Sequence, residues 1–291
     1  ALPISLKRTI AGVTSESATW TYAQQIEDFG SEQTEVFARV YQISSVAGRG
    51  YALQGYLQHN VLADLLFSNV VLLMHMNGAD GGTTFTDEKG KSVTVYGNAQ
   101  TSTTESKFNG SSCKLDGTGD YLGLAASSDF DFGAGDFTWE CWIYQVTVMT
   151  GTYADAIWCS QAGPVGFAVA IFSDGKIGIT ADSPAGGDWD IRKGCDPGDP
   201  RGSTAITLGT WAHIARSHSG SNWYGFVNGA VDQTFTSSAS ISNAGSGYFL
   251  GHWHDGNARC FNGYIADLRI TKGACRYTSA FTPPAVPFPN S

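Results

Sequence analysis

The sequence is poor in charged residues, which make up 15% of its 291 positions, and it is poorest in basic ones. Its 17 lysines and arginines are scattered along the chain and face 26 aspartates and glutamates, so the formal net charge is −9. Proteins that bind nucleic acid use a basic stripe to neutralise phosphates. The chain has no such stripe, and we expect no nucleic-acid partner.

Long apolar runs are also missing. The longest stretches, such as residues 70–74, fall far short of the roughly 20 residues of a membrane helix, so we expect no membrane insertion. Residues 1–20 lack the apolar core of about 7–15 residues that marks a secretory signal. We therefore expect synthesis in the cytoplasm.

Glycine and aromatic residues are abundant. The chain has 36 glycines, 12% aromatic and 42% hydrophobic residues, a composition that suits short strands joined by tight turns. It is long enough for a β-sandwich domain of 200 or more residues. The composition predicts an all-β fold.

Short apolar segments separated by turn residues follow one another from about residue 69. Asp174-Gly175 and Asn228-Gly229 are hairpin signals. Strands at this spacing predict a two-sheet antiparallel jelly-roll sandwich. The expected strands are 70–76, 93–96, 112–115, 121–124, 137–144, 156–160, 166–173, 176–180, 211–217, 223–227, 247–250 and 265–271.

Residues 1–66 have a different pattern. Alternation predicts strands at 35–43 and 50–57. Residues 23–29 could instead form one or two helical turns that end at Gly30, and periodicity does not decide this. The segment is too small for an ordinary independent core. We interpret it as a small β-rich attachment arm, followed by the sandwich domain at 67–291.

The six cysteines show no CxxC or zinc-ribbon spacing, which disfavours a metal cluster. Cys260 and Cys275 flank an expected strand whose ends, at about 3.3 Å per residue, lie too far apart for a disulfide. Cys141 alternates with core-type residues and is expected to be a buried thiol. Cys195, in a Gly/Pro-rich loop, is the better disulfide candidate; Cys195, Cys260 and Cys275 are the possible disulfide or intersubunit thiols.

Six segments, in their order and spacing over about residues 69–289, resemble the laminin-G-like, concanavalin A-like jelly-roll domains of bacteriophage tail-fibre-type virion proteins. The segments are LLMHMNGADGGTTFTDEKG (72–90), GNAQTSTTESKFNGSSCKLDGTGDYL (97–122), DFDFGAGDFTWECWIY (129–144), TWAHIARSHSG (210–220), YGFVNG (224–229) and GYIADLRITKGACRYTSAFTPPAVPFP (263–289).

The resemblance implies a non-enzymatic virion protein, such as a tail-fibre, neck, collar or capsid-decoration component. Its arm would bind other virion proteins, and its jelly roll would adhere to host-surface polysaccharide at the virion surface. A homo-oligomer, for example a trimer, is expected. The alternatives are a purely structural interaction module of the virion and a carbohydrate-binding module of a secreted glycan-active protein.

The resemblance also predicts how the sandwich closes. The first strand, 70–76, and the last, 265–271, would be neighbours. The segment 281–289 contains four prolines, which fix φ and remove ladder donors, so it should run extended across the sandwich as a strap. Cys113, Cys141 and Cys275 depart from the family pattern and suggest added covalent stabilisation.

Calcium is a possible cofactor, because related folds bind it between the first and last strands. The candidate ligands are Asp80, Asp87 and Asp267. The alternative is that these residues form turns or accept hydrogen bonds within the strand.

Catalysis is not expected. Glycoside hydrolases of this fold place paired carboxylates on one strand face in an ExDxE spacing, and the sequence has none. Glu140 stands alone and is expected to face solvent. His213 alternates with Trp211 and Ala215 and is expected to be structural.

Sugar binding needs exposed aromatic rings beside polar groups in the loops. Trp189, Trp223 and Trp253 meet this description, and His254 and Asp255 flank Trp253. Core packing is the alternative role for each tryptophan. Of the three, Trp189 and Trp253 are the first choices.

Overall fold

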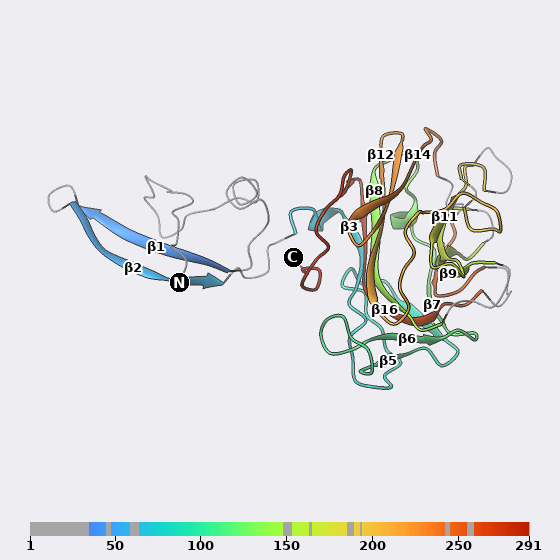
Figure 1. Cartoon of the computed structure of the whole chain (residues 1–291), viewed down its shortest axis with the longest axis horizontal. Helices are drawn as coiled ribbons and strands as arrows, with labels where there is room; N and C mark the ends of the chain where they lie inside the picture. Colours follow the sequence, from blue (N-terminus) through green and yellow to red (C-terminus); the bar gives the residue numbers. More distant parts are fainter. Residues whose placement is uncertain are drawn as a thin grey trace. The chain divides into compact units, whose positions relative to one another are not determined.

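The computed structural model describes residues 35–44, 48–58, 64–147, 153–162, 165–184, 189–192, 194–241, 245–254 and 259–290 (Figure 1). By its internal contacts the chain divides into two compact units, 1–63 and 64–291. In the first unit, β1 (Glu35–Ser44) and β2 (Gly48–Gln58) pair antiparallel, which confirms the two expected strands. The segment 23–29 lies outside the described residues.

The second unit is a sandwich of two antiparallel sheets, as expected from the sequence (Figure 1). The six-stranded sheet has the order β11-β10-β9-β15-β7-β4. Its strands are β4 (Val93–Tyr96), β7 (Tyr121–Leu124), β9 (Asp155–Ser160), β10 (Phe167–Ile171), β11 (Ile177–Ala181) and β15 (Tyr248–Leu250).

The eight-stranded sheet has the order β14-β13-β12-β8-β16-β6-β5, and β3 pairs with β16. Its strands are β3 (Val70–Met74), β5 (Gln100–Ser102), β6 (Ser112–Asp116), β8 (Phe137–Gln145), β12 (Trp211–Ser219), β13 (Asn222–Val227), β14 (Ala230–Thr236) and β16 (Asn262–Lys272). Two short 3₁₀ turns, η1 (Phe67–Asn69) and η2 (Ser128–Phe130), complete the elements.

Every expected strand of the sandwich is present, with ends that differ by a few residues, whereas β5 and β14 were not expected. Both lie at the edges of the eight-stranded sheet and carry many polar residues. The Asn228-Gly229 turn is confirmed: its φ angles of 50° and 75° suit the tight hairpin between β13 and β14. Within the described part of the chain, no helix has the length and apolar character needed to cross a membrane.

Alternating side chains of both sheets fill the space between them. Trp139, Trp158, Phe167 and Tyr248 are fully buried there, and the rings of Trp158 and Tyr248 stack at a centroid distance of 4.6 Å. Burial of this apolar surface is the main force that holds the two sheets together.

The sandwich is closed by its first and last segments, as the sequence predicted. β3 pairs antiparallel with β16. The expected strap at 281–289 is bonded near both of its ends: Phe281 N donates to Gly229 O over 2.9 Å, and Phe288 N donates to Asp267 Oδ2 over 2.7 Å. Residues 275–280 lead into it, and we call the whole segment, 275–290, the strap. The Phe288 ring packs against β3.

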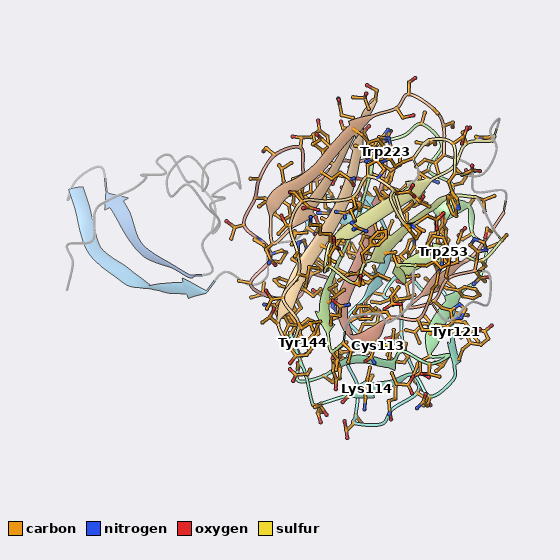
Figure 2. The ribbon with its side chains drawn as sticks, turned by 45° about the vertical axis from the view of Figure 1, so that its right-hand side comes forward. Cys113, Lys114, Tyr121, Tyr144, Trp223 and Trp253 are labelled. Carbon is orange, nitrogen blue, oxygen red and sulfur yellow. The ribbon has the colours of Figure 1, made fainter. Side chains whose placement is uncertain are left out.

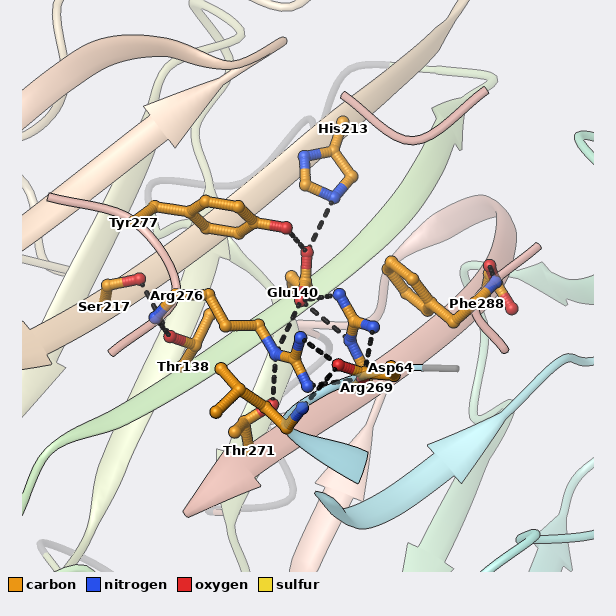
Figure 3. A network of polar contacts seen from close by, with 12 residues as sticks. Asp64, Thr138, Glu140, His213, Ser217, Arg269, Thr271, Arg276, Tyr277 and Phe288 are labelled. Carbon is orange, nitrogen blue, oxygen red and sulfur yellow. Dashed lines mark hydrogen bonds and ion pairs between the residues drawn. The ribbon is translucent and has the colours of Figure 1, made fainter. Parts of the chain in front are cut away.

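Glu140 of β8 is the centre of a buried ion network beneath the strap (Figure 3). Arg269 of β16 donates from Nε and Nη2 to Glu140 Oε1 over 2.9 and 2.7 Å. The Tyr277 hydroxyl donates to Oε2 over 2.9 Å, and His213 Nε2 lies 3.2 Å from the same oxygen. Asp64 joins Arg269 to Arg276 of the strap.

The expectation that Glu140 faces solvent is wrong. Its side chain does point away from the interface between the sheets, but the strap covers that part of the outer face. Burial alone would raise the pKa of Glu140, but the Arg269 guanidinium, His213 and Arg276 outweigh burial and hold the pKa at about 2. The carboxylate is therefore charged at neutral pH.

Glu140→Gln should destabilise the sandwich by about 3–5 kcal/mol, because it leaves buried guanidinium groups without their counter-charge. Since the folded pKa lies below the unfolded value, the stabilisation by Glu140 is complete above about pH 4.5 and is lost towards about pH 2. Urea unfolding at several pH values would show the two proteins converging in acid. Exposed Glu88→Gln is the control, and an undiminished difference at about pH 2 would contradict this account.

Candidate functional site

The outer face of the six-stranded sheet carries a group of aromatic side chains. In β4, β7 and β15, residues such as Val95, Leu122 and Leu250 point into the core. Because strand side chains alternate between faces, Tyr96, Tyr121 and Phe249 point outward.

These three residues and His252 form the aromatic face. Tyr96 and Tyr121 are register partners, and their rings stack at 4.3 Å with an interplanar angle of 11°. Phe249 and His252 lie 4.8 and 4.5 Å from the Tyr121 ring. Tyr96 is 40% exposed and the other three are half-buried, so ring surface is open to solvent.

Gly123 sets the position of the Tyr96 ring. A Cβ at residue 123 would lie 2.9 Å from Tyr96 Cε2, so the ring occupies the space that glycine leaves. Burial, with smaller contributions from Tyr96 and Cys260, raises the pKa of Tyr121. Its hydroxyl is therefore protonated at neutral pH and can donate a hydrogen bond.

Trp189, Trp253 and His254 come together beside this face. The two indoles are 6.0 Å apart, and His254 lies 6.2 Å from Trp189 and 5.5 Å from Trp253. Figure 2 shows Trp253 and Tyr121 on the same side of the domain. The structure thus brings together the two tryptophans that were the first choices from the sequence, whereas Asp255 lies outside the described residues.

The expectation that these indoles are exposed is wrong. Trp189 is 6% and Trp253 4% exposed, because both pack with Ala156, Ala170 and Cys195 in a second hydrophobic cluster on the sheet. The Arg259 guanidinium also lies 4.6 Å from the Trp253 ring. These tryptophans attach the long 181–203 loop to the six-stranded sheet.

Trp223 is also buried, with 1% of its surface exposed. It lies between the sheets and stacks on Phe235 at 5.1 Å, with Phe137 and His218 beside it. Its predicted exposure is wrong because residue 223 is an inward position of β13.

The three candidate calcium ligands hold the backbone instead. Asp80 accepts from Thr103 N, and Asp87 accepts from Leu73 N, both over 2.8 Å. Asp267 accepts from Phe288 N and contacts His75. No group of three or more His, Cys, Asp or Glu residues in the described ranges could hold a metal ion. The three aspartates thus form no ligand set, and calcium binding stays a prediction.

All six cysteines lie within the described residues, and none forms a disulfide. The predicted disulfide role of Cys195 is wrong, because its loop packs on the sheet and leaves the thiol 1% exposed. Cys260 is buried as well, and Cys275 is half-buried with its thiol directed to Tyr277 O. The expected buried thiol at Cys141 is confirmed.

Asp155, the first residue of β9, is a buried carboxylate near this end of the sheet. The residue is 6% exposed, and its carboxyl group has no hydrogen bond or ion pair with a described residue. Burial raises its pKa to about 7.

Local sequence patterns contain little sign of the aromatic face. Tyr96 ends one short strand and Tyr121 begins another, and nothing local shows that the two strands are neighbours. Only the outward positions of alternating strands could have indicated these residues, and that inference needs the strand order.

A family model agrees with this fold. Residues 116–277, more than half of the chain, match a laminin G model described as the concanavalin A-like lectin/glucanases superfamily. No curated protein matches the chain.

Solved binding domains of toxins share the fold. The binding domain of Paraclostridial Mosquitocidal Protein 1 is 14% identical, with a TM-score of 0.56 over 75% of this chain and 50% of that domain. The binding domain of botulinum neurotoxin serotype D/C is 14% identical, with a TM-score of 0.52 over 71% and 49%. The binding domain of serotype G is 12% identical, with a TM-score of 0.50 over 74% and 49%. The chain spans about half the length of each.

Gly123→Ala should displace the Tyr96 ring while leaving the sandwich folded, because the new methyl group would overlap Tyr96 Cε2. We expect altered chemical shifts or crystal positions for Tyr96 and a small change in melting temperature. Gly119→Ala is the comparison variant: nothing lies within 4 Å of the added methyl group, and its φ of 74° strains the backbone, so it should leave the Tyr96 ring in place. An unmoved Tyr96 ring in Gly123→Ala would refute the proposed packing.

Asp155→Asn should stabilise the protein at neutral and alkaline pH. Because the folded pKa lies above the unfolded value, the native carboxyl group costs stability as pH rises from about 4 to about 7. Each unit of difference between the folded and unfolded pKa corresponds to about 1.4 kcal/mol of stability. Because solvent partly reaches the carboxyl group, the total cost is reduced, and we expect Asp155→Asn to raise the free energy of unfolding by about 2 kcal/mol. Melting curves of the two proteins should coincide near pH 4; a gap that does not depend on pH would exclude this cause.

Proposed function

The chain belongs to the concanavalin A-like lectin/glucanase superfamily, and from this premise we propose that it is a non-enzymatic protein that binds glycans through the aromatic face. The observation that carries the proposal is the partly exposed stack of Tyr96 and Tyr121, with Phe249 and His252 beside it. The C–H faces of sugars pack on aromatic rings, and tyrosine hydroxyls supply hydrogen bonds.

The lack of catalysis is part of the proposal. Glu140 and His213, which were weighed separately as catalytic candidates from the sequence, are both 0% exposed. The Glu140 carboxylate accepts hydrogen bonds from Arg269 and Tyr277. A group enclosed in this way cannot reach a glycosidic bond.

For the biological setting, we propose a phage virion protein that adheres to host-surface polysaccharide. It would be displayed at the virion surface, with residues 1–66 contacting other virion proteins and the chain forming a homo-oligomer. The ordered segments quoted above support this setting. A carbohydrate-binding module of a secreted protein would use the aromatic face in the same way.

The purely structural alternative makes a different prediction. If the sandwich only contacts other virion proteins, the aromatic face should bind no sugar. A glycan array separates the two, because it needs no knowledge of the host.

Tyr121→Ala and Tyr96→Ala should each weaken binding to the glycans that the wild-type protein retains, by about tenfold, which corresponds to about 1.4 kcal/mol. Each variant removes a ring that sugar would contact. Tyr224→Ala, a half-buried tyrosine of the other sheet, is the matched control and should bind normally. Absence of wild-type binding to every glycan, or equal losses in all three variants, would favour the structural alternative.

A further inference from the structure

The outer face of the eight-stranded sheet carries a second ordered group of side chains. The register of β5, β6, β16, β8 and β12 pairs Gln100 with Lys114, Lys114 with Tyr264, Tyr264 with Tyr144, and Tyr144 with Trp211. Neighbouring strands lie about 4.8 Å apart. The five side chains therefore form one line across the strands, which we call the cross-strand row.

The cross-strand row begins where the strap and the segment with Lys107 and Phe108 no longer cover the outer face of this sheet. Of the outward residues of β8, Thr138 and Glu140 lie under the strap. Trp142 lies under Lys107, whose Nζ is 3.8 Å from the ring, and beside Phe108. Tyr144 is the next outward residue and is half-exposed. Figure 2 places it on the side of the domain away from Tyr121.

One half of the row is aromatic. The Tyr144 ring lies 5.6 Å from Trp211 and 5.8 Å from Tyr264. Val146 and Leu208, which are 44% and 42% exposed, continue the apolar surface at its edge. Gly209 N donates to Gln145 O over 2.9 Å, which holds the Leu208 loop against the end of β8. An apolar surface of this kind marks a binding region.

The other half of the row is polar and basic. Lys114 and Lys107 form no ion pair with any described residue, although the chain carries a net charge of −9. Two acidic groups lie nearby. Glu105 is engaged by the Tyr144 hydroxyl, and Asp116, two residues after Lys114 on β6, accepts a hydrogen bond from Thr118 N over 2.7 Å. Two lysines without counter-charges beside a line of aromatic rings complement a ligand that has both sugar faces and negative charge.

We propose that the cross-strand row binds a linear polysaccharide that bears carboxylates, of the uronic-acid class. Its sugar rings lie over Trp211 and Tyr144, and its carboxylates face Lys114 and Lys107. A linear chain fits because the row is straight and crosses five strands. This inference adds a second site to the proposed function and rests on it only in that both sites bind glycans. The two sites lie on different sheets.

The test is electrophoresis of the full chain in native gels that contain polygalacturonate, alginate or hyaluronate, with neutral dextran and galactan as comparison gels. We expect at least one acidic polymer to retard the wild-type protein. Trp211→Ala should weaken this binding about tenfold, and Trp211→Phe, which keeps a ring, should retain most of it. Melting curves confirm that each variant is folded.

The charge of the ligand is tested separately. Lys114→Gln should weaken binding several-fold at low salt, and the difference should disappear at about 0.5 M NaCl, where charges are screened. Lys176→Gln is the control. Lys176 directly precedes β11 of the six-stranded sheet and has no ion pair with a described residue.

The outcomes separate the two sites. No retardation by the acidic polymers, or retardation that Trp211→Ala and Lys114→Gln leave unchanged, overturns the cross-strand row. If Tyr121→Ala abolishes binding while the Trp211 variant does not, the aromatic face alone binds glycan, and the proposed function stands without the second site.

Discussion

The buried carboxylate of Glu140 is the interaction on which the closure of the sandwich depends. It lies on the central strand β8 and binds Arg269 of β16 and Tyr277 of the strap, while Asp64 connects both arginines of the network (Figure 3). Removing these charges from water is costly, and only complete pairing repays that cost. The network therefore fixes the strap in one place on the sheet, where a purely apolar contact would tolerate several.

Each sheet consequently presents two kinds of outer surface. The strap covers part of the eight-stranded sheet and leaves the end with Tyr144 open. On the six-stranded sheet, the loop that carries Trp189 covers one part and leaves the end with Tyr121 open. Buried tryptophans and ion pairs hold the covers in place. The half-exposed tyrosines at the two open ends combine a flat apolar ring with a polar hydroxyl, the chemistry on which the proposed glycan binding depends.

Local patterns predicted the strands and hairpins well, because alternation and turn residues act over a few positions. The pairing of β3 with β16 and the course of the strap followed from family resemblance. The burial of Trp223 depends on which face of β13 points inward. The burial of Glu140 could not be predicted from local patterns, since it depends on the strap, which lies far away in the sequence. The aromatic face was missed for the same reason: Tyr96, Tyr121 and Phe249 become neighbours only through the order of the strands.

The contact between Asp64 and Arg276 joins residues 212 positions apart. A ribosome makes the chain from its N-terminal end, so β3 emerges early and waits for its partner β16 until nearly all of the domain has been synthesised. During that interval the edge of β3 that later pairs with β16 is open to other strands. Until β16 has been made, pairing of β3 with a strand of another chain therefore competes with closure of the sandwich.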